Sequence, residues 1–206
     1  NEKETKVVFE TTLGNIVVKL YNETPKHRDN FLKVVNDSVY NGVLFHRVIK
    51  DFMIQTGDST TRHAKPGDTV GQHQPDYTIP AEIVYPQYFH KRGALAAARE
   101  ADADNPERAS SSAQFYIVYG TNYSELTLNR IQERLDANTN GKVKLTDDIR
   151  DYYRKYGGAP HLDGQYTVFG EVVEGMNVVR DIDYVSTDDY DRPVNDVRII
   201  KATVVK

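Results

Sequence analysis

The most informative segment of the chain is FHRVIKDFMIQTGD, residues 45–58. Its β-branched and aromatic residues, together with those just before it, predict strands over 43–49 and 52–55. Taken by itself, the segment leaves the roles of its side chains open. Phe52 and its neighbours suit a hydrophobic core, and Arg47 suits a structural ion pair, but the same residues could equally face a ligand.

The residues before this segment carry clear local signals. Residues 7–12 and 16–21 are rich in β-branched and aromatic side chains and flank a Gly-Asn turn, so they predict a β-hairpin. Thr24 then places a capping hydroxyl before Pro25, whose missing N–H costs nothing at the first helical position. We therefore expect a helix that begins there and ends near Asn36.

The rest of the chain alternates short strands with loops and adds more helix. Residues 57–93 are loop-rich, and a loop of that length is more often functional than idle. Residues 123–157 show helical spacing on both sides of a polar run, which predicts a helix-loop-helix. Further short strands are expected at 94–98, 114–119, 167–172 and 197–205, and a second short helix at 176–182. This order favours a closed β-barrel capped by two helices, in a single domain over residues 1–206 with a helical insertion at 123–157.

Composition excludes several classes of protein. The chain has 206 residues, with 26 Lys and Arg against 30 Asp and Glu, which gives a net charge of −4. We expect no nucleic-acid partner, because phosphate binding needs clustered cations. We also expect no membrane span, because no apolar run approaches the ~20 residues that crossing a bilayer requires. The lack of Cys excludes disulfides and thiol catalysis. Because Asn1 stands in place of Met, we expect an exported, periplasmic protein, with the cytoplasm as the alternative.

Residues 136–147 have the spacing of a calcium-binding loop. Oxygen-bearing side chains occupy positions 1, 3, 5 and 12 of this run, and glycine occupies position 6, as in an EF-hand. Against this, Lys144 stands at position 9 and Asp147 replaces the longer Glu at position 12. We therefore interpret the run as an ordinary polar turn and predict no metal site.

Residues 45–58 resemble the signature of the cyclophilins, the peptidyl-prolyl cis/trans isomerases. Four later blocks resemble the same family in the same order: YTIPAE at 77–82, GALAAA at 93–98, SAQFYI at 112–117 and LDGQYTVFG at 162–170. The resemblance runs from residue 7 to the end of the chain and leaves out 123–157. It implies an eight-stranded antiparallel barrel that isomerises X-Pro bonds in peptides and in unfolded or partly folded proteins. It also implies no cofactor, and we expect a monomer.

The resemblance further implies a role for eleven residues. Arg47 would contact the substrate and stabilise the twisted amide, and Gln55 beside it would be the second catalytic residue. The remaining positions would bind the substrate, in part through an apolar proline pocket: Phe52, Met53, Ala98, Arg99, Gln114, Tyr116, His161, Leu162 and Tyr166.

Some of these positions depart from the family pattern. Tyr116 stands in place of the usual phenylalanine, Tyr166 in place of a histidine, and His161 in place of a tryptophan. Tyr166 and His161, together with Arg99, leave a second interpretation open, in which the chain is a binding module or holdase of cyclophilin fold. Such a protein would grip proline segments without accelerating rotation and would use 123–157 as a partner surface.

Overall fold

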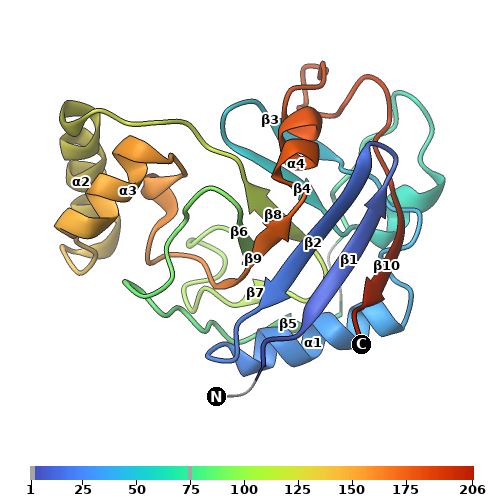
Figure 1. Cartoon of the computed structure of the whole chain (residues 1–206), viewed down its shortest axis with the longest axis horizontal. Coiled ribbons are helices and arrows are strands. Elements are labelled where there is room, and N and C mark those ends of the chain that lie inside the picture. The colour runs from blue at the N-terminus through green and yellow to red at the C-terminus, as the bar shows by residue number, and fades with distance from the viewer. Residues whose placement is uncertain (1–2, 74–75) are drawn as a thin grey trace.

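The computed structural model describes residues 3–73 and 76–206; residues 1 and 2 of the predicted domain and 74 and 75 of the predicted loop lie outside the described residues. Eight strands form one antiparallel sheet (Figure 1). Their spatial order is β10 (Ile199–Val204), β1 (Lys6–Thr11), β2 (Gly14–Leu20), β9 (Val168–Glu174), β6 (Ala94–Ala97), β8 (Phe115–Val118), β4 (Met53–Thr56) and β3 (Arg47–Ile49). Two further short strands, β5 (Thr78–Ile79) and β7 (Ser110–Ser111), pair with each other. The predicted mainly β, eight-stranded antiparallel architecture is confirmed.

The predicted hairpin is formed by β1 and β2. Val7 pairs with Val18, and Phe9 pairs with Ile16. All four of these side chains are buried, whereas the residues that alternate with them are less so. The period-two pattern of the sequence therefore sets which face of the hairpin covers the core.

The prediction of a closed barrel is wrong. The sheet begins at β10 and ends at β3, and these two strands do not pair in the described part of the chain. Residues 43–46, predicted as strand, form only one isolated bridge, between Leu44 and Arg198. The backbone groups of Leu44 that face away from this bridge bond to side chains: its N–H donates to the hydroxyl of Thr61, and its carbonyl accepts from the hydroxyl of Thr56.

The bridge itself rests on the neighbours of Leu44: the N–H of Phe45 donates to the carbonyl of Val197, and the N–H of Ile199 donates to the carbonyl of Val43. Further along, the N–H of Val48 on β3 donates to the carbonyl of Asp191, so a loop rather than β10 covers the outer edge of β3.

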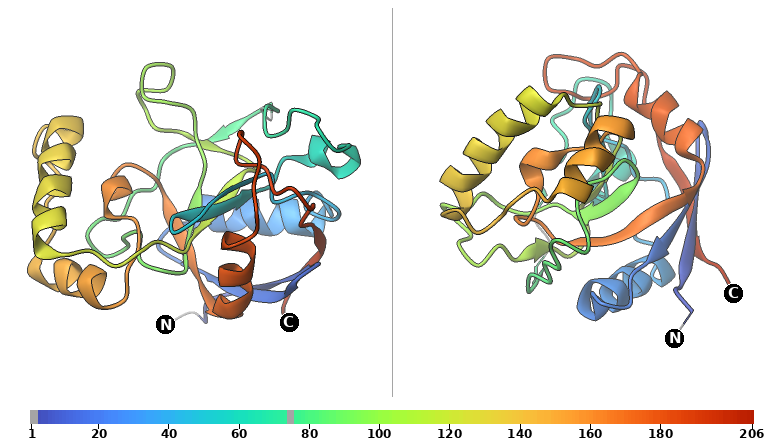
Figure 2. Two further views of the ribbon diagram at one scale, coloured as in Figure 1. Left: turned by 90° about the horizontal axis from the view of Figure 1, so that it is seen from above. Right: turned by 60° about the vertical axis from the view of Figure 1, so that its left-hand side comes forward.

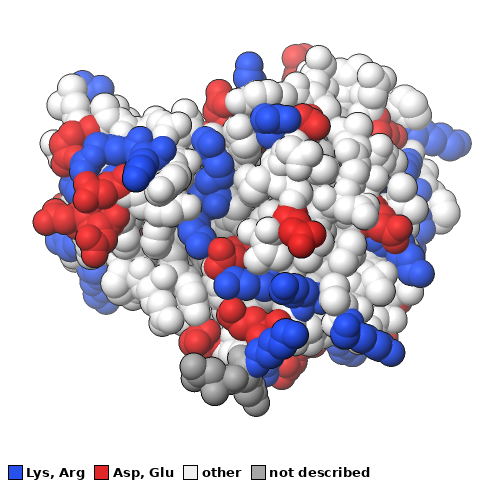
Figure 3. Space-filling view, in the orientation of Figure 1, with Lys and Arg blue, Asp and Glu red and all other residues white. Residues whose placement is uncertain are grey.

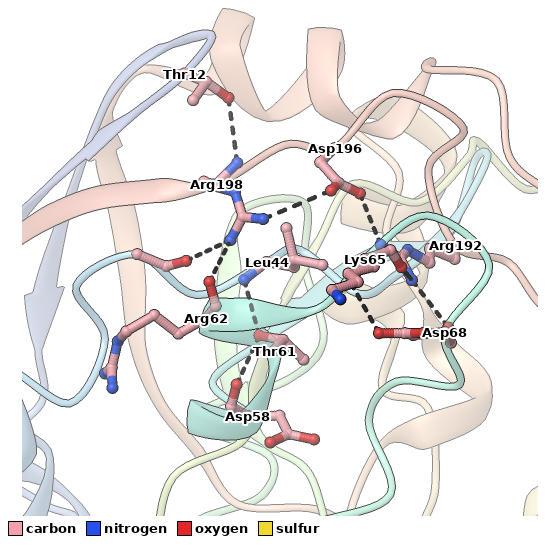
Figure 4. Close-up of polar contacts among 11 residues, drawn as sticks. Thr12, Leu44, Asp58, Thr61, Arg62, Lys65, Asp68, Arg192, Asp196 and Arg198 are labelled. Atoms are coloured by element: carbon pink, nitrogen blue, oxygen red, sulfur yellow. Dashed lines mark hydrogen bonds and ion pairs between the residues drawn. The ribbon is translucent and has the colours of Figure 1, made fainter.

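The side chain of Arg198 bridges the open seam, which is the gap between β10 and β3, as Figure 4 shows. Its guanidinium donates to the carbonyls of Gly42 and Arg62 at 2.8 and 3.1 Å and forms an ion pair with Asp196. The backbone N–H of Arg198 donates to the hydroxyl of Thr12 at 3.2 Å. The sheet is therefore a half-barrel, and the gap between its free edges is spanned by a few backbone hydrogen bonds between residues 42–45 and 197–199, by loops and by side chains.

Helices α1 (Pro25–Asn36) and α4 (Met176–Asp183) lie at opposite ends of the sheet in Figure 1. Helix α1 begins at the predicted proline, and α4 coincides with the predicted second helix to within one residue. Both helices bury their apolar faces in one core cluster with the strands, α1 through Phe31 and α4 through Val179 among others. Two predicted elements thus cap the sheet as expected.

Helices α2 (Glu125–Thr139) and α3 (Asp147–Lys155) form a separate pair to one side of the sheet, as Figures 1 and 2 show. They share a small core of their own that includes Leu128, Leu135 and Tyr153, and the ring of Phe89 packs against it. Helix α2 also contacts the short 3-10 helix η2 (Pro160–Leu162). The predicted helix-loop-helix is confirmed, and it rests on the segment that leads into β9.

A second 3-10 helix, η1 (Ser59–His63), lies in the predicted loop region. None of the described helices has both the length and the apolar composition that a bilayer span needs. On the face shown in Figure 3, Lys and Arg lie in small groups beside Asp and Glu, with uncharged surface between them. This face therefore presents no broad area of a single charge.

Candidate active site

Three adjacent strands bring the central residues of the site together. Arg47 on β3 pairs with Gln55 on β4, and Gln55 pairs with Tyr116 on β8. Directly paired residues project on the same side of a sheet, so these three side chains share one face. Met53 lies two residues before Gln55 and therefore also projects from that face.

A small pocket of about 130 Å³ opens on this face. Nine of the eleven predicted site residues line it: Arg47, Phe52, Met53, Gln55, Ala98, Arg99, Tyr116, Leu162 and Tyr166. Met53 and Tyr116 are almost fully buried, whereas Arg47 is exposed. An apolar cavity of about 150 Å³ holds a benzene ring, so this pocket has room for one small ring.

Arg47 is oriented by a chain of side-chain amides. Its Nη1 donates to Oε1 of Gln55 at 3.3 Å, and Nε2 of Gln55 donates to Oε1 of Gln114 at 3.1 Å. Nε2 of Gln114 then donates to the carbonyls of His73 and Gly71. Because a carbonyl can only accept, this last contact sets the direction of both amides. The oxygen of Gln55 therefore faces the guanidinium.

Among the described residues, no carboxylate pairs with Arg47, and its hydrogen-bond partner is the neutral amide of Gln55. The structural ion pair considered from the sequence is thus not formed. An exposed guanidinium at the rim of an apolar pocket has donors free for a bound molecule.

The rest of the pocket is lined by Arg99 and by aromatic and aliphatic side chains. The guanidinium of Arg99 lies over the ring of Tyr166, 4.2 Å from its centroid, and donates through Nε to the carbonyl of Gln165. The ring of Phe52 lies 5.1 Å from that of His161. Burial, with a smaller contribution from Arg134, lowers the pKa of His161 to about 4. His161 is therefore neutral at physiological pH.

Two predicted residues support the pocket without lining it. Gln114 is buried and bonds to Gln55, and the half-buried ring of His161 lies against that of Phe52. Both were expected to bind the substrate directly, and in this structure each instead touches a residue that lines the pocket. Gln114 and His161 are thus each one side chain away from the pocket.

Sequence reasoning missed the polar groups beneath the pocket. The hydroxyl of Tyr116 lies 2.7 Å from Nε2 of His90, whose Nδ1 lies 3.1 Å from a carboxylate oxygen of Asp163. The available signal was Tyr116 itself, because a buried phenol in place of the expected phenylalanine needs a hydrogen-bond partner. Its partners stand far away in the sequence, and so the signal does not name them.

The run at 136–147 does not form a single loop. Helix α2 continues to Thr139, so the first residues of the calcium-loop pattern are helical. The carboxylate of Asp136 accepts from Nζ of Lys144 at 2.7 Å and from the amide of Gln132. Asn140 then ends the helix in the left-handed conformation. This geometry agrees with the interpretation as a polar turn between helices.

Comparison with known proteins identifies the class to which this fold and site belong. Residues 6–204 match the family described as cyclophilin type peptidyl-prolyl cis-trans isomerase/CLD. A Staphylococcus aureus (strain USA300) protein provisionally named as a peptidyl-prolyl cis-trans isomerase is 32% identical over 199 residues, which cover 95% of this chain and 89% of the relative. A Staphylococcus saprophyticus protein with the same name is 30% identical over 208 residues, which cover 100% of this chain and 94% of the relative.

Among solved structures, the chain resembles a Cryptosporidium parvum cyclophilin type peptidyl-prolyl cis-trans isomerase. The TM-score is 0.68 at 22% sequence identity, with 99% of each chain covered. A second structure of that protein, solved in the presence of the dipeptide Ala-Pro, has a TM-score of 0.66. The chain therefore belongs to the cyclophilin-type peptidyl-prolyl cis/trans isomerases, and its activity is the one that gives the family its name.

Proposed function

We propose that Arg47 accelerates rotation about X-Pro bonds by stabilising the twisted amide. Rotation breaks amide resonance at a barrier of ~18–20 kcal/mol, and no other bond has to be made or broken. In the twisted state the prolyl nitrogen regains its lone pair, so a fixed donor beside it binds that state better than the planar one. The guanidinium of Arg47 is such a donor, because it stays charged at any physiological pH.

One such contact does not account for the whole acceleration. Shortening exchange from ~100 s to ~1 ms requires about five powers of ten, or ~7 kcal/mol. A charge-assisted hydrogen bond contributes only ~1.5–3 kcal/mol of this. We assign the remainder to the pocket, which would hold the prolyl ring between Met53, Tyr116 and Leu162 while the acyl side turns.

The observation that carries this proposal is the position of Arg47 at the rim of a pocket with room for one ring, where its hydrogen-bond partner among the described residues is the neutral Gln55. Gln55 would act with Arg47 by orienting it. Phe52, Ala98, Arg99 and Tyr166 would bind the substrate beside the pocket, and Gln114 and His161 would support that binding from behind.

The substrates would be proline-containing peptides and unfolded or partly folded proteins, handled by a monomer without a cofactor. A structural relative was solved in the presence of the dipeptide Ala-Pro. We further propose that residues 1–206 act as one domain, in which 123–157 is an insertion that contacts longer clients.

The test is a pair of substitutions at Arg47 in a protease-coupled isomerisation assay on a short X-Pro peptide. Arg47→Ala should lower kcat/KM by about 100-fold or more, and Arg47→Lys should recover only part of this, because an ammonium lacks the planar fork. Arg180→Ala, which removes an exposed arginine on α4, is the matched control and should have no effect. A folded Arg47→Ala protein that keeps more than half of the wild-type activity would remove Arg47 from the mechanism.

A further inference from the structure

A buried chain of hydrogen bonds joins helix α3 to the pocket. The hydroxyl of Tyr153 on α3 donates to Oδ2 of Asp163 at 2.6 Å. The other carboxylate oxygen of Asp163 lies 3.1 Å from Nδ1 of His90, and Nε2 of His90 lies 2.7 Å from the hydroxyl of Tyr116. Tyr153, Asp163 and His90 are each 0% exposed, and Tyr116 is 5% exposed.

The direction of these bonds follows from the groups at the two ends. Burial raises the pKa of the Tyr116 phenol well above 10, so this hydroxyl keeps its proton and can donate to Nε2 of His90. That leaves Nδ1 of the ring to donate to Asp163. The same carboxylate also accepts from the backbone N–H of His90 at 2.7 Å and from Tyr153. Every polar group along the chain is thereby satisfied.

The chain fixes two walls of the pocket at once. The ring of Tyr116 lines the pocket, and Asp163 directly follows Leu162, which lines another side. In addition, the N–H of Ala159 donates to the carbonyl of His90 at 2.8 Å. A shift of Asp163 would therefore move the Leu162 wall and, through His90, the ring of Tyr116.

The backbone is shaped to let Tyr153 reach this position. Gly158 has a φ of +153°, and a Cβ added to it would lie 2.6 Å from the Tyr153 ring and 2.4 Å from the carbonyl of His90. The ring of Tyr153 therefore lies directly against the glycine backbone, where a side chain would exclude it. Packing and hydrogen bonding together hold Tyr153 in one orientation.

We propose that Tyr153 is a positioning residue for the isomerase, acting on the proline pocket through Asp163, His90 and Tyr116. The helical pair α2 and α3 contributes no residue to the pocket lining, yet through this chain it sets the geometry of that pocket. The inference rests on the proposed function in one respect, namely that the pocket lined by Tyr116 is where the prolyl ring binds.

A double-mutant cycle tests the inference. Tyr153→Phe and Tyr116→Phe each remove one hydroxyl and should each lower kcat/KM by about three- to tenfold. The kcat/KM of the double variant should be no lower than that of the less active single variant. Tyr152→Phe is the matched control, because it removes a hydroxyl from the same helix that makes no hydrogen bond within the described part of the chain, and its activity should equal that of the wild type.

The cycle separates a positioning role from general loss of stability. If the fold-loss in kcat/KM caused by Tyr153→Phe is at least halved in the Tyr116→Phe background, the chain of hydrogen bonds transmits the effect. An effect that is absent in the wild-type background, or that falls by less than half in the variant, overturns the inference. Neither result changes the Arg47 test, so the failure of this inference is distinct from that of the proposed function.

A measurement on the unmodified protein covers the case in which Tyr153→Phe does not fold, or in which the wild type proves inactive. Titration with a short Ala-Pro peptide should shift the side-chain ¹⁵N resonances of His90 and the ring resonances of Tyr153, as followed by NMR. The ring resonances of Tyr156, which follows the same helix but takes no part in the chain of hydrogen bonds, should not shift. Binding that leaves both His90 and Tyr153 unchanged would overturn the inference.

Discussion

Removing the acceptor that orients Arg47 should slow the enzyme without unfolding it. The proposed change is Gln55→Met, which keeps the length of the side chain but removes both its hydrogen bonds, to Arg47 at 3.3 Å and to Gln114 at 3.1 Å. A hydrogen bond to a charged group contributes ~1.5–3 kcal/mol. Because Arg47 is exposed and its contact with Gln55 is long, we take the lower end of this range. At ~1.4 kcal/mol per factor of ten, kcat/KM should fall about tenfold.

The same protease-coupled assay should show that Gln55 acts through Arg47. In the Arg47→Ala background the Gln55→Met change should lower kcat/KM by less than about threefold, because the group it orients is already gone. Gln87→Met, which alters an exposed glutamine that does not line the pocket, is the matched control. A tenfold loss in both backgrounds, or no loss in either, would refute the orientation argument.

Three further predictions follow from the site, the core and the helical pair. Burial lowers the pKa of both His46 and His161 to about 4, so both rings stay neutral at physiological pH. The kcat/KM should therefore be flat within about twofold from pH 6 to 9, and a bell-shaped profile would point to acid–base catalysis instead. Burial raises the pKa of Asp183 from 3.8 to about 7, so folding favours its protonated form. The stability gained in this way is present below pH 3.8 and is lost as the pH rises through 7. Asp183→Asn should therefore raise the free energy of unfolding at pH 8 by up to ~4 kcal/mol and leave it unchanged near pH 3.5, as measured by urea titration; an equal gain at both values, or a gain from the exposed-site control Asp181→Asn, would contradict this. Replacing 123–157 by a Gly-Ser linker should keep turnover of a four-residue X-Pro peptide within about tenfold and impair refolding of a longer proline-limited protein more strongly; equal effects on both substrates would show that the insertion contacts no client.

Much of the fold follows from signals that lie close together in the sequence. The hairpin of β1 and β2 is set by alternating apolar residues on either side of a short turn, and α1 begins at Pro25. The pocket was also predictable, because Arg47, Gln55 and Met53 come from two strands joined by a tight turn. Their mutual register is fixed once those strands pair.

The open seam was not predictable from local pattern. Residues 43–46 have the composition of a strand and do bond to residues 197–199, but on their other side the backbone groups of Leu44 bond to the hydroxyls of Thr56 and Thr61. Both threonines reach Leu44 only after the chain has turned back on itself. Propensity therefore predicted a full strand where tertiary contacts leave a single bridge, and no local signal shows that a loop at Asp191 covers the edge of β3.

The buried polar chain was equally hidden. Tyr153, Asp163, His90 and Tyr116 come from four different segments, and His90 lies 73 residues from its carboxylate partner. Each residue, considered alone, suits a surface loop or an ordinary core. Their common function emerges only when the fold brings the four side chains into contact, and for this reason the supporting residues of the site were harder to predict than its lining.

The most direct test of the central claim is the rate at which a bound peptide interconverts between cis and trans. Exchange NMR on a short Ala-Pro peptide, at concentrations that saturate the protein, measures this rate separately from the Kd. We predict that the wild type shortens exchange from tens of seconds to milliseconds, and that Arg47→Ala slows exchange on the protein at least ~100-fold with the Kd changed by less than about tenfold. A wild-type protein that binds the peptide tightly but leaves its exchange rate at the uncatalysed value would instead be a holdase, and this result would contradict a catalytic role for Arg47 and its pocket.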